Sequence, residues 1–123
     1  MRRVFLDTNF LIDLIRFKIG LEEIQVFLQE PIDFFILSST LKELQTIARN
    51  KGKSGNLAKV ALEIVKSKGI KILETEQSPD KAFLSLADKN TIIATNDSEL
   101  RKKLKKLGIK TIYLRAKKYL EVS

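Results

Sequence analysis

The sequence contains no cysteine and no histidine, and these two absences restrict the chemistry that it can perform. Without cysteine the chain has neither a disulfide nor a thiol nucleophile. Without histidine it lacks the usual zinc ligand and the commonest general base. If the protein is an enzyme, its reaction must use carboxylates, lysines, hydroxyl groups or a metal ion held by oxygen.

The chain also lacks a long apolar run and a linker rich in proline, glycine or serine. No run approaches the ~18 residues of a membrane span, and the apolar part of "MRRVFLDTN" is too short for a signal peptide. With 44% hydrophobic and 31% charged residues, the composition is that of a globular protein. We therefore expect a single domain over residues 1–123, located in the cytoplasm and without a membrane partner.

The net charge of +8 is unevenly distributed along the chain. Residues 1–50 carry six basic and seven acidic side chains, whereas residues 51–123 carry 17 basic and eight acidic ones. The densest basic segment is "RKKLKKLGIK", residues 101–110. Such a segment suggests a polyanionic partner, most simply nucleic acid. The alternative is a solvated, lysine-rich helix face of the kind common in heat-adapted proteins.

Five short apolar runs alternate with segments of helical spacing. The runs are continuous, which is typical of strands that are covered on both faces. This order predicts an α/β protein with three α/β/α layers around a central parallel sheet of about five strands. The expected strands are residues 3–7, 33–38, 70–74, 91–95 and 110–115.

The connections carry further signals. Gly69 and Gly108 each follow a predicted helix and precede a strand, which is the usual place for a left-handed C-cap. "ARNKGKSGN", residues 48–56, is the most loop-like stretch and should separate two helices. On a helix over residues 97–107, Leu100, Leu104 and Leu107 share one stripe and should face the sheet.

Four acids are expected at the carboxyl ends of the strands, where parallel α/β sheets hold their functional sites. Asp7 and Asp97 end the first and fourth strands, Glu43 lies about one helical turn after the second, and Asp80 opens the helix after the third. Each acid by itself also has a structural explanation. Asp7 could cap a helix, and Glu43 could face solvent. The negative charge of Asp80 could interact favourably with the helix dipole. For Asp97, the neighbouring Asn96 could cap while Glu99 closes a capping box.

Taken together, the four acids favour a metal site. Carboxylates that share a pocket repel one another, and a structural role would not select that arrangement. A hard cation such as Mg²⁺ or Mn²⁺ prefers carboxylate oxygen and offsets the repulsion. A metal held in this way can activate a water molecule for attack on a phosphodiester. Basic side chains nearby attract the phosphate backbone of a nucleic acid. The combination describes a nuclease.

Four segments in this order resemble the PIN-domain nucleases, most closely small archaeal members akin to ribosomal-RNA processing endonucleases. They are "FLDTNFLID", "SSTLKEL", "SPDKAFLSLA" and "IIATNDSELRKKLKKLGIKTIYLR", and together they extend over nearly the whole chain. The resemblance implies that Asp7, Glu43, Asp80 and Asp97 form the acidic catalytic and metal site. It also implies that Asn9 and Thr95 are polar residues that orient carboxylates or water. Related proteins often have two adjacent acids at the third position, where this chain has Asp80 followed by Lys81.

The leading hypothesis is a metal-dependent endoribonuclease that uses Mg²⁺ or Mn²⁺ and acts in ribosomal or other RNA processing. The alternatives are the toxin of a toxin–antitoxin pair, whose partner would be an antitoxin, and a non-catalytic RNA-binding module. A phosphoacceptor receiver domain would need adjacent acids after the first strand, where this chain has Thr8 and Asn9. The resemblance also implies a homodimer. The side chains expected to bind RNA are Lys51, Lys53, Arg101, Lys102 and Lys105.

Overall fold

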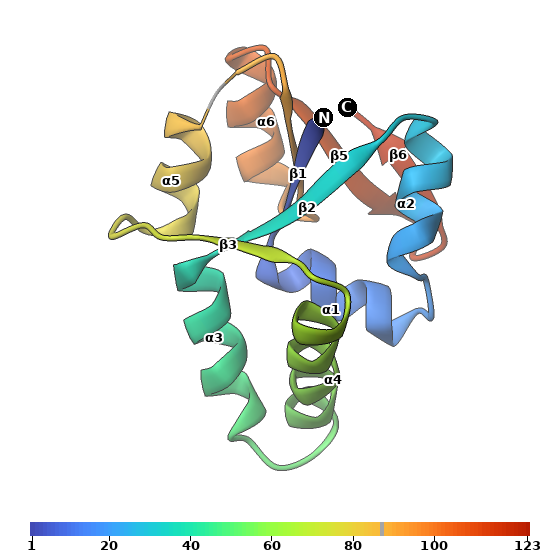
Figure 1. Cartoon of the computed structure of the whole chain (residues 1–123), viewed down its shortest axis with the longest axis vertical. Helices are drawn as coiled ribbons and strands as arrows, with labels where there is room; N and C mark the ends of the chain where they lie inside the picture. The colour runs from blue at the N-terminus through green and yellow to red at the C-terminus, as the bar shows by residue number, and fades with distance from the viewer. Residues whose placement is uncertain (87) are drawn as a thin grey trace.

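The computed structural model describes residues 1–86 and 88–123 and has one central sheet of six strands (Figure 1). The strand order is β3-β2-β1-β4-β5-β6. The first five strands pair in parallel, and β6 pairs antiparallel with β5. The strands are β1 Arg2–Leu6, β2 Ile32–Leu37, β3 Lys71–Leu73, β4 Thr91–Ala94, β5 Lys110–Arg115 and β6 Tyr119–Val122.

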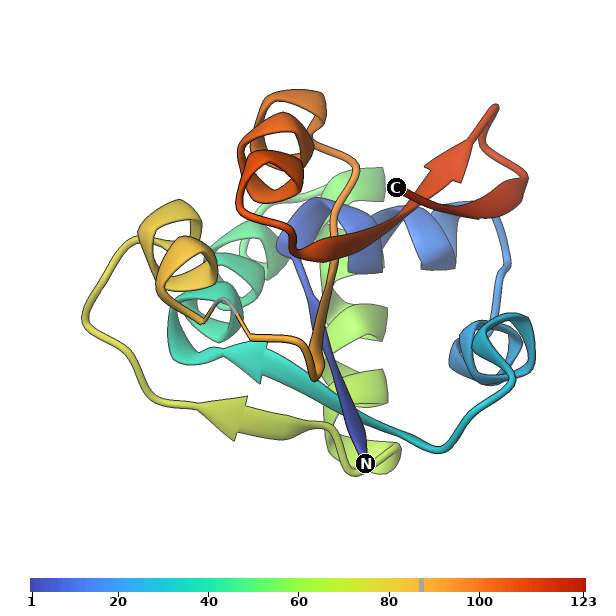
Figure 2. The same cartoon turned by 90° about the horizontal axis from the view of Figure 1, so that it is seen from above.

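Six helices cover the two faces of this sheet. Along β1, Val4 and Leu6 belong to one buried cluster, which includes side chains of α1 to α4. Phe5 points to the opposite face and packs in a second cluster with side chains of α5 and α6, which lie side by side in Figure 2. The predicted α/β/α arrangement is therefore confirmed. The helices are α1 Thr8–Arg16, α2 Leu21–Leu28, α3 Ser38–Ala48, α4 Lys53–Ser67, α5 Pro79–Ser85 and α6 Ser98–Lys106.

The register of the two central strands determines which residues emerge together at the carboxyl edge. Leu6 of β1 lies opposite Ala94 of β4 in the parallel ladder. The next residue of each strand, Asp7 and Thr95, therefore leaves the sheet at the same level. The last three residues of each strand are apolar and buried, so the polar groups that follow are held by a rigid support.

The sixth strand was not predicted. β6 is an edge strand that is only half-buried, so it lacks the continuous apolar run of the central strands. The turn before it places Ala116 and Lys117 in the left-handed region, with φ of 52° and 61°. Hairpin turns of this kind are normally signalled by asparagine or glycine, and neither residue is present here. Figure 2 shows the β5–β6 hairpin at the opposite end of the sheet from β3.

Two further expectations need correction, and one agrees with the structure. The loop between α3 and α4 is shorter than expected, because α4 already begins at Lys53. Leu107 does not face the sheet: it is 56% exposed, because the helix ends at Lys106 and Ile109 is buried instead. Gly69 and Gly108 adopt left-handed φ values of 64° and 76° after their helices, as predicted. None of the helices described is long and apolar enough to cross a bilayer.

Candidate active site

Asp7 is held in place by hydrogen bonds to both of its carboxylate oxygens. It is the N-cap residue of α1, and its Oδ1 accepts a hydrogen bond from the backbone N–H of Thr8 at 2.9 Å. Its Oδ2 accepts one from the hydroxyl of Thr95 at 2.8 Å. Thr95 is completely buried at the end of the neighbouring strand. The Asp7 carboxylate is thus both a helix cap and a fixed acidic group at the edge of the sheet.

Asp97 is connected to Asp7 through the same threonine. The backbone N–H of Asp97 donates to the Thr95 hydroxyl oxygen at 3.2 Å. Asp97 is the N-cap of α6, where its Oδ1 accepts from the N–H groups of Glu99 and Leu100 at 3.0 and 3.2 Å. The alternative in which Asn96 caps this helix is therefore wrong. Both capping bonds are made by Oδ1, so capping does not occupy Oδ2 of Asp97.

Glu43 and Asp80 approach the same edge from two other helices. Glu43 lies on α3 and is exposed, and Asp80 is an exposed residue in the first turn of α5. The Ser38 hydroxyl at the start of α3 exchanges hydrogen bonds of 3.0 and 3.1 Å with the backbone N–H and C=O of Thr75. This contact ties the segment that leads to Asp80 to the helix that carries Glu43.

The electrostatics show that the four carboxylates affect one another. Burial raises the pKa of Asp7, and the negative charges of Asp80 and Asp97 raise it further, against the lowering effect of its hydrogen bonds to Thr95 and Thr8. Packing around its carboxylate raises the pKa of Glu43, as do the charges of Asp7 and Asp80. The nearby Thr8 hydroxyl lowers it, although the contact is not a hydrogen bond of ordinary geometry. The charges of Asp80 and Asp97 thus act on Asp7, and those of Asp7 and Asp80 act on Glu43.

The donor chemistry of this edge fits a hydrated Mg²⁺ or Mn²⁺ ion, but the ligands are not preassembled. Among residues 1–86 and 88–123, no three acidic side chains lie close enough to form a ready-made metal site. The buried hydroxyls of Thr8, Ser39 and Thr40 have no hydrogen-bond partner in the same part of the chain. The Thr8 hydroxyl, which is close to the Glu43 carboxylate, would suit an ion that keeps several of its waters.

The remaining predicted site residues differ in their surroundings. Asn9 is exposed on the first turn of α1 and lines a polar pocket beside the acids. Lys51 and Lys53 are exposed between α3 and α4 and at the start of α4, and Lys102 and Lys105 are exposed on α6. Arg101 differs, because its guanidinium lies 3.9 Å from the centre of the Tyr113 ring. Part of its side chain is thus occupied by a cation–π contact.

Sequence reasoning missed one contact that supports the site. The side-chain amide of Asn96 donates from Nδ2 to Oδ2 of Asp13 at 2.9 Å, and its Oδ1 accepts from the N–H of Leu114 at 2.9 Å. It therefore joins α1, the turn after β4 and strand β5. In the sequence, Asp13 looks like any polar residue of an amphipathic helix. No signal in the sequence distinguishes it as the partner of Asn96.

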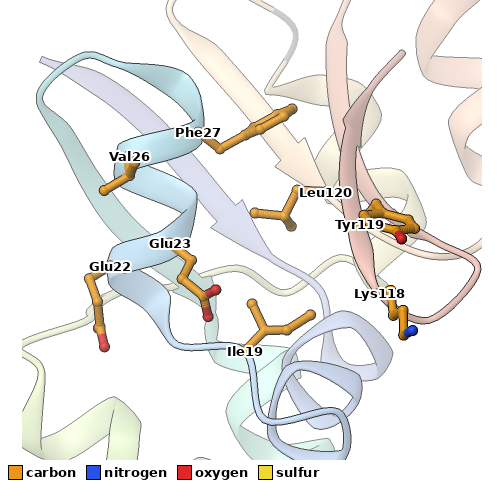
Figure 3. Close-up of a pocket in the computed structure, with 8 residues that line it drawn as sticks. All are labelled: Ile19, Glu22, Glu23, Val26, Phe27, Lys118, Tyr119 and Leu120. Atoms are coloured by element: carbon orange, nitrogen blue, oxygen red, sulfur yellow. The ribbon is translucent and has the colours of Figure 1, made fainter.

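A second pocket, of about 540 Å³, lies between α2 and strand β6 (Figure 3). Val26 and Phe27 line it from α2, and Tyr119 and Leu120 line it from β6. It includes none of the four predicted acids and has few polar groups that converge. It is therefore not the candidate active site.

Comparison with known proteins gives consistent results. The PIN like domain family matches residues 4–117. Ribonuclease VapC4 of Methanocaldococcus jannaschii is 36% identical over 128 aligned residues, which cover 99% of this chain and 97% of that protein. Ribonuclease VapC9 of Archaeoglobus fulgidus is 33% identical over 87 residues, which cover 69% of this chain and 63% of that protein.

Two solved structures resemble the fold. The PIN domain endonuclease Utp24 has a TM-score of 0.80 at 24% identity, and the match covers 98% of this chain and 90% of that one. A domain of a functionally unknown protein from Methanocaldococcus jannaschii has a TM-score of 0.60 at 22% identity, with 94% and 93% covered. At these identities the two structures support the fold alone.

Proposed function

The chain belongs to the PIN-like domain family, and on that premise we propose that it is a metal-dependent endoribonuclease that hydrolyses phosphodiester bonds in RNA. Both curated relatives are named as ribonucleases, which supports RNA as the substrate. The observation that carries the proposal is the link from Asp7 through Thr95 to Asp97. It supports a shared role for acids that are far apart in the sequence.

The residues proposed to hold the metal are Asp7, Glu43, Asp80 and Asp97. When bound there, Mg²⁺ or Mn²⁺ would neutralise the carboxylates, activate a water and stabilise charge on the phosphodiester. Thr95 keeps one oxygen of Asp7 oriented, and the capping bonds of Asp97 fix its carboxylate at the start of α6. The raised pKa values of Asp7 and Glu43 reflect burial and repulsion that a cation would offset.

RNA would reach this edge with the help of basic side chains on two sides. Lys102 and Lys105 project from the helix that Asp97 opens, and Lys51 and Lys53 lie where α3 meets α4. Lysine contacts to phosphates add affinity without reading the base sequence. We expect Arg101 to contribute less than the lysines, because its guanidinium stacks on Tyr113.

The biological role that we favour is the processing of ribosomal or other structured RNA, on the basis of the resemblance in residues 95–115. A second role is a toxin that an antitoxin partner controls. The two curated relatives are both named VapC ribonucleases, and this shared name is the reason to keep the toxin role as the alternative. A small antitoxin gene next to this one, and growth arrest that its product relieves, would identify the toxin role. A homodimer is compatible with either role.

The direct test is cleavage of structured and unstructured RNA by the purified chain, with and without Mg²⁺ or Mn²⁺. We expect metal-dependent cleavage by the wild type and loss of cleavage in Glu43→Gln. Glu63→Gln is a matched control, since Glu63 is also an exposed helical glutamate but lies on α4 and is not one of the predicted acids. Tight RNA binding without cleavage under any metal condition would instead identify a non-catalytic RNA-binding module.

A further inference from the structure

A polar pocket of about 570 Å³ lies between α1, the connection from α3 to α4, and the turn after β4. Its volume is within the range of ~300–1,000 Å³ that is usual for small-ligand sites. Two isoleucines form its apolar part, and its other lining residues are polar. These polar residues are Asn9, Asp13, Arg16, Asn50, Ser54 and Asn96.

Several residues that line the pocket are close in the chain to the predicted acids. Asn9 is two residues after Asp7, and Asn96 directly precedes Asp97. On the α3 side, Ile47 lines the pocket and lies one helical turn from Glu43. Ile47 and Glu43 also line a smaller neighbouring pocket of about 300 Å³. An RNA strand bound at the acids would therefore have this pocket next to it.

One wall of the pocket is held rigidly by side-chain contacts. Asn96 is fixed between Asp13 and the backbone of Leu114, as described above. The other oxygen of Asp13 accepts a hydrogen bond from Arg16 at 3.0 Å. The charges of Asp13 and Arg16 are thereby paired. The guanidinium of Arg16 keeps further N–H donors for a ligand.

The opposite wall is shaped by two glycines. Gly52 has a φ of 97°, which an ordinary side chain rarely adopts. At Gly55 a Cβ atom would collide with the backbone carbonyl oxygen of Asn50. Glycine at both positions lets the chain turn tightly from α3 into α4. This turn places the side chains of Asn50 and Ser54 at the pocket.

The unused polar groups of the pocket suit a nucleotide. The side chains of Asn9, Asn50 and Ser54 make no hydrogen bond with another residue in the described ranges 1–86 and 88–123. An asparagine amide offers a donor and an acceptor together, which matches the edge of a base. The remaining N–H donors of Arg16 suit a phosphate, and Lys53, which directly precedes Ser54 in the chain, adds a positive charge. Bases in RNA are read in this way mainly when they are unpaired.

We infer that this pocket binds one unpaired RNA nucleotide next to the scissile phosphate and so determines where the protein cleaves the RNA. The inference rests on the proposed ribonuclease function for its meaning, but its binding test does not require cleavage. The apolar part of the pocket would contact the face of the base. Asn50 and Asn9 would bind its edge, and Arg16 the adjoining phosphate.

The test measures binding of single-stranded RNA in EDTA, so that no metal-dependent cleavage occurs. A set of oligonucleotides carries one abasic position each, and affinity is measured by fluorescence anisotropy. For the wild type, we expect one abasic position to weaken binding by roughly tenfold, the value of one good amide–base pair. In Asn50→Ala that loss should largely disappear, because the amide that reads the base is already absent.

Asn56→Ala is the matched control, because Asn56 is also exposed but lies within α4 and does not line the pocket. It should retain the wild-type abasic profile. Ser54→Ala should reduce the same abasic effect as Asn50→Ala, and urea unfolding would confirm that all three variants are folded. An abasic profile that is flat in the wild type, or equal in Asn50→Ala and Asn56→Ala, would overturn the inference.

Cleavage is then measured separately with Mn²⁺ on a single-stranded RNA of random sequence. If the wild type cuts, we expect a base preference beside the cut that Asn50→Ala weakens and Asn56→Ala keeps. If the wild type binds RNA but does not cut it, the proposed nuclease function fails while the abasic result still decides the pocket. The two failures are therefore distinguishable.

Discussion

The hydroxyl of Thr95 donates a hydrogen bond of 2.8 Å to Oδ2 of Asp7, although 88 residues separate the two along the chain. The same hydroxyl oxygen accepts the backbone N–H of Asp97 at 3.2 Å. A single buried side chain thus sets the relative position of the first and last acids. This contact exists because β1 and β4 are neighbours that end at the same level of the sheet.

Thr95→Val should therefore destabilise the protein and impair the site together. Valine has nearly the same shape, but it leaves Oδ2 of Asp7 and the N–H of Asp97 without their partner. We expect a loss of about 1–3 kcal/mol in the free energy of unfolding, measured in urea without metal, and weaker Mn²⁺ binding. Thr95→Ser keeps the hydroxyl and should recover most of both.

Thr111→Val provides the control for this substitution. Thr111 is also completely buried in a strand, but its hydroxyl has no hydrogen-bond partner among the described residues. Replacing it by valine removes an unsatisfied polar group, so stability should be unchanged or higher. Equal losses in the two variants would mean that burial of the residue, and not its link to Asp7, determines the effect.

Asp97 has two roles that two substitutions can separate. Asparagine is as good an N-cap as aspartate, so Asp97→Asn should keep the helix start while removing one of the repelling charges. We expect unchanged or higher thermal stability without metal, and loss of cleavage. Asp97→Ala loses the capping bonds and should cost about 1 kcal/mol. A marked fall in melting temperature for Asp97→Asn would show that the charge itself stabilises the fold.

The positions of Asp7 and Asp97 just after two strands could be predicted because they depend on local signals. Asp7 and Asp97 each follow a buried apolar run, and parallel strands place such ends at one edge. The capping role of Asp97 was harder to predict, because Asn96 and Asp97 are both good N-cap residues. The sequence does not show which of the two caps α6. The side chain of Asn96 does not cap the helix, because it makes hydrogen bonds with Asp13 and the backbone of Leu114. Those partners are close only after the sheet has formed.

The same distinction explains the other differences. Strand β6 was missed because an edge strand need not be apolar on both faces, and its turn uses Ala116 and Lys117 in place of glycine or asparagine. The early start of α4 depends on the close approach of Gly55 to Asn50. The polar pocket likewise combines residues from α1, α4 and the turn after β4. Spacing along the chain indicates helices and strands, but it does not show which side chains meet across them.

The lysines of α6 should affect RNA affinity through charge alone. Lys102→Ala with Lys105→Ala should weaken binding of all RNA sequences about equally. It should also reduce the dependence of log affinity on log salt by roughly 0.7 per lost contact on single strands. Arg101 is left in place, because its removal would also break the contact with Tyr113. Filter binding over a salt series measures the slope.

Lys66→Ala with Lys68→Ala is the control for the charge change. These lysines are exposed at the end of α4, and Lys68 lines a pocket beside Ile32, where β2 begins. They are therefore at the opposite edge of the sheet from the acids. If both double variants reduce the slope equally, the lysines of α6 form only part of a general positive surface.

Asp7 should make the metal-free protein less stable as the pH rises. Its folded-state pKa is raised above the ordinary value of 3.8, first by burial and then by the charges of Asp80 and Asp97. In the range between the unfolded and folded pKa values, the folded protein holds more protons than the unfolded chain. Its stability therefore decreases with pH across that range. The contribution is complete below the unfolded pKa and is lost as the pH rises through the folded pKa.

Asp7→Asn removes this titration while retaining an N-cap side chain for α1. In EDTA, we expect Asp7→Asn to be more stable than the wild type at pH 7, with a difference that shrinks as the pH falls towards 4. Comparing the two proteins cancels the contributions of groups that Asp7 does not affect, such as Asp88, whose pKa is lowered by its hydrogen bonds to Thr91 and Asn90. Mn²⁺ should stabilise the wild type more than the variant at pH 7, because the ion would bind the deprotonated carboxylate of Asp7, which the variant lacks. A stability difference that is constant from pH 4 to 7 would show that Asp7 does not titrate abnormally and that the acids repel one another too weakly to need a cation.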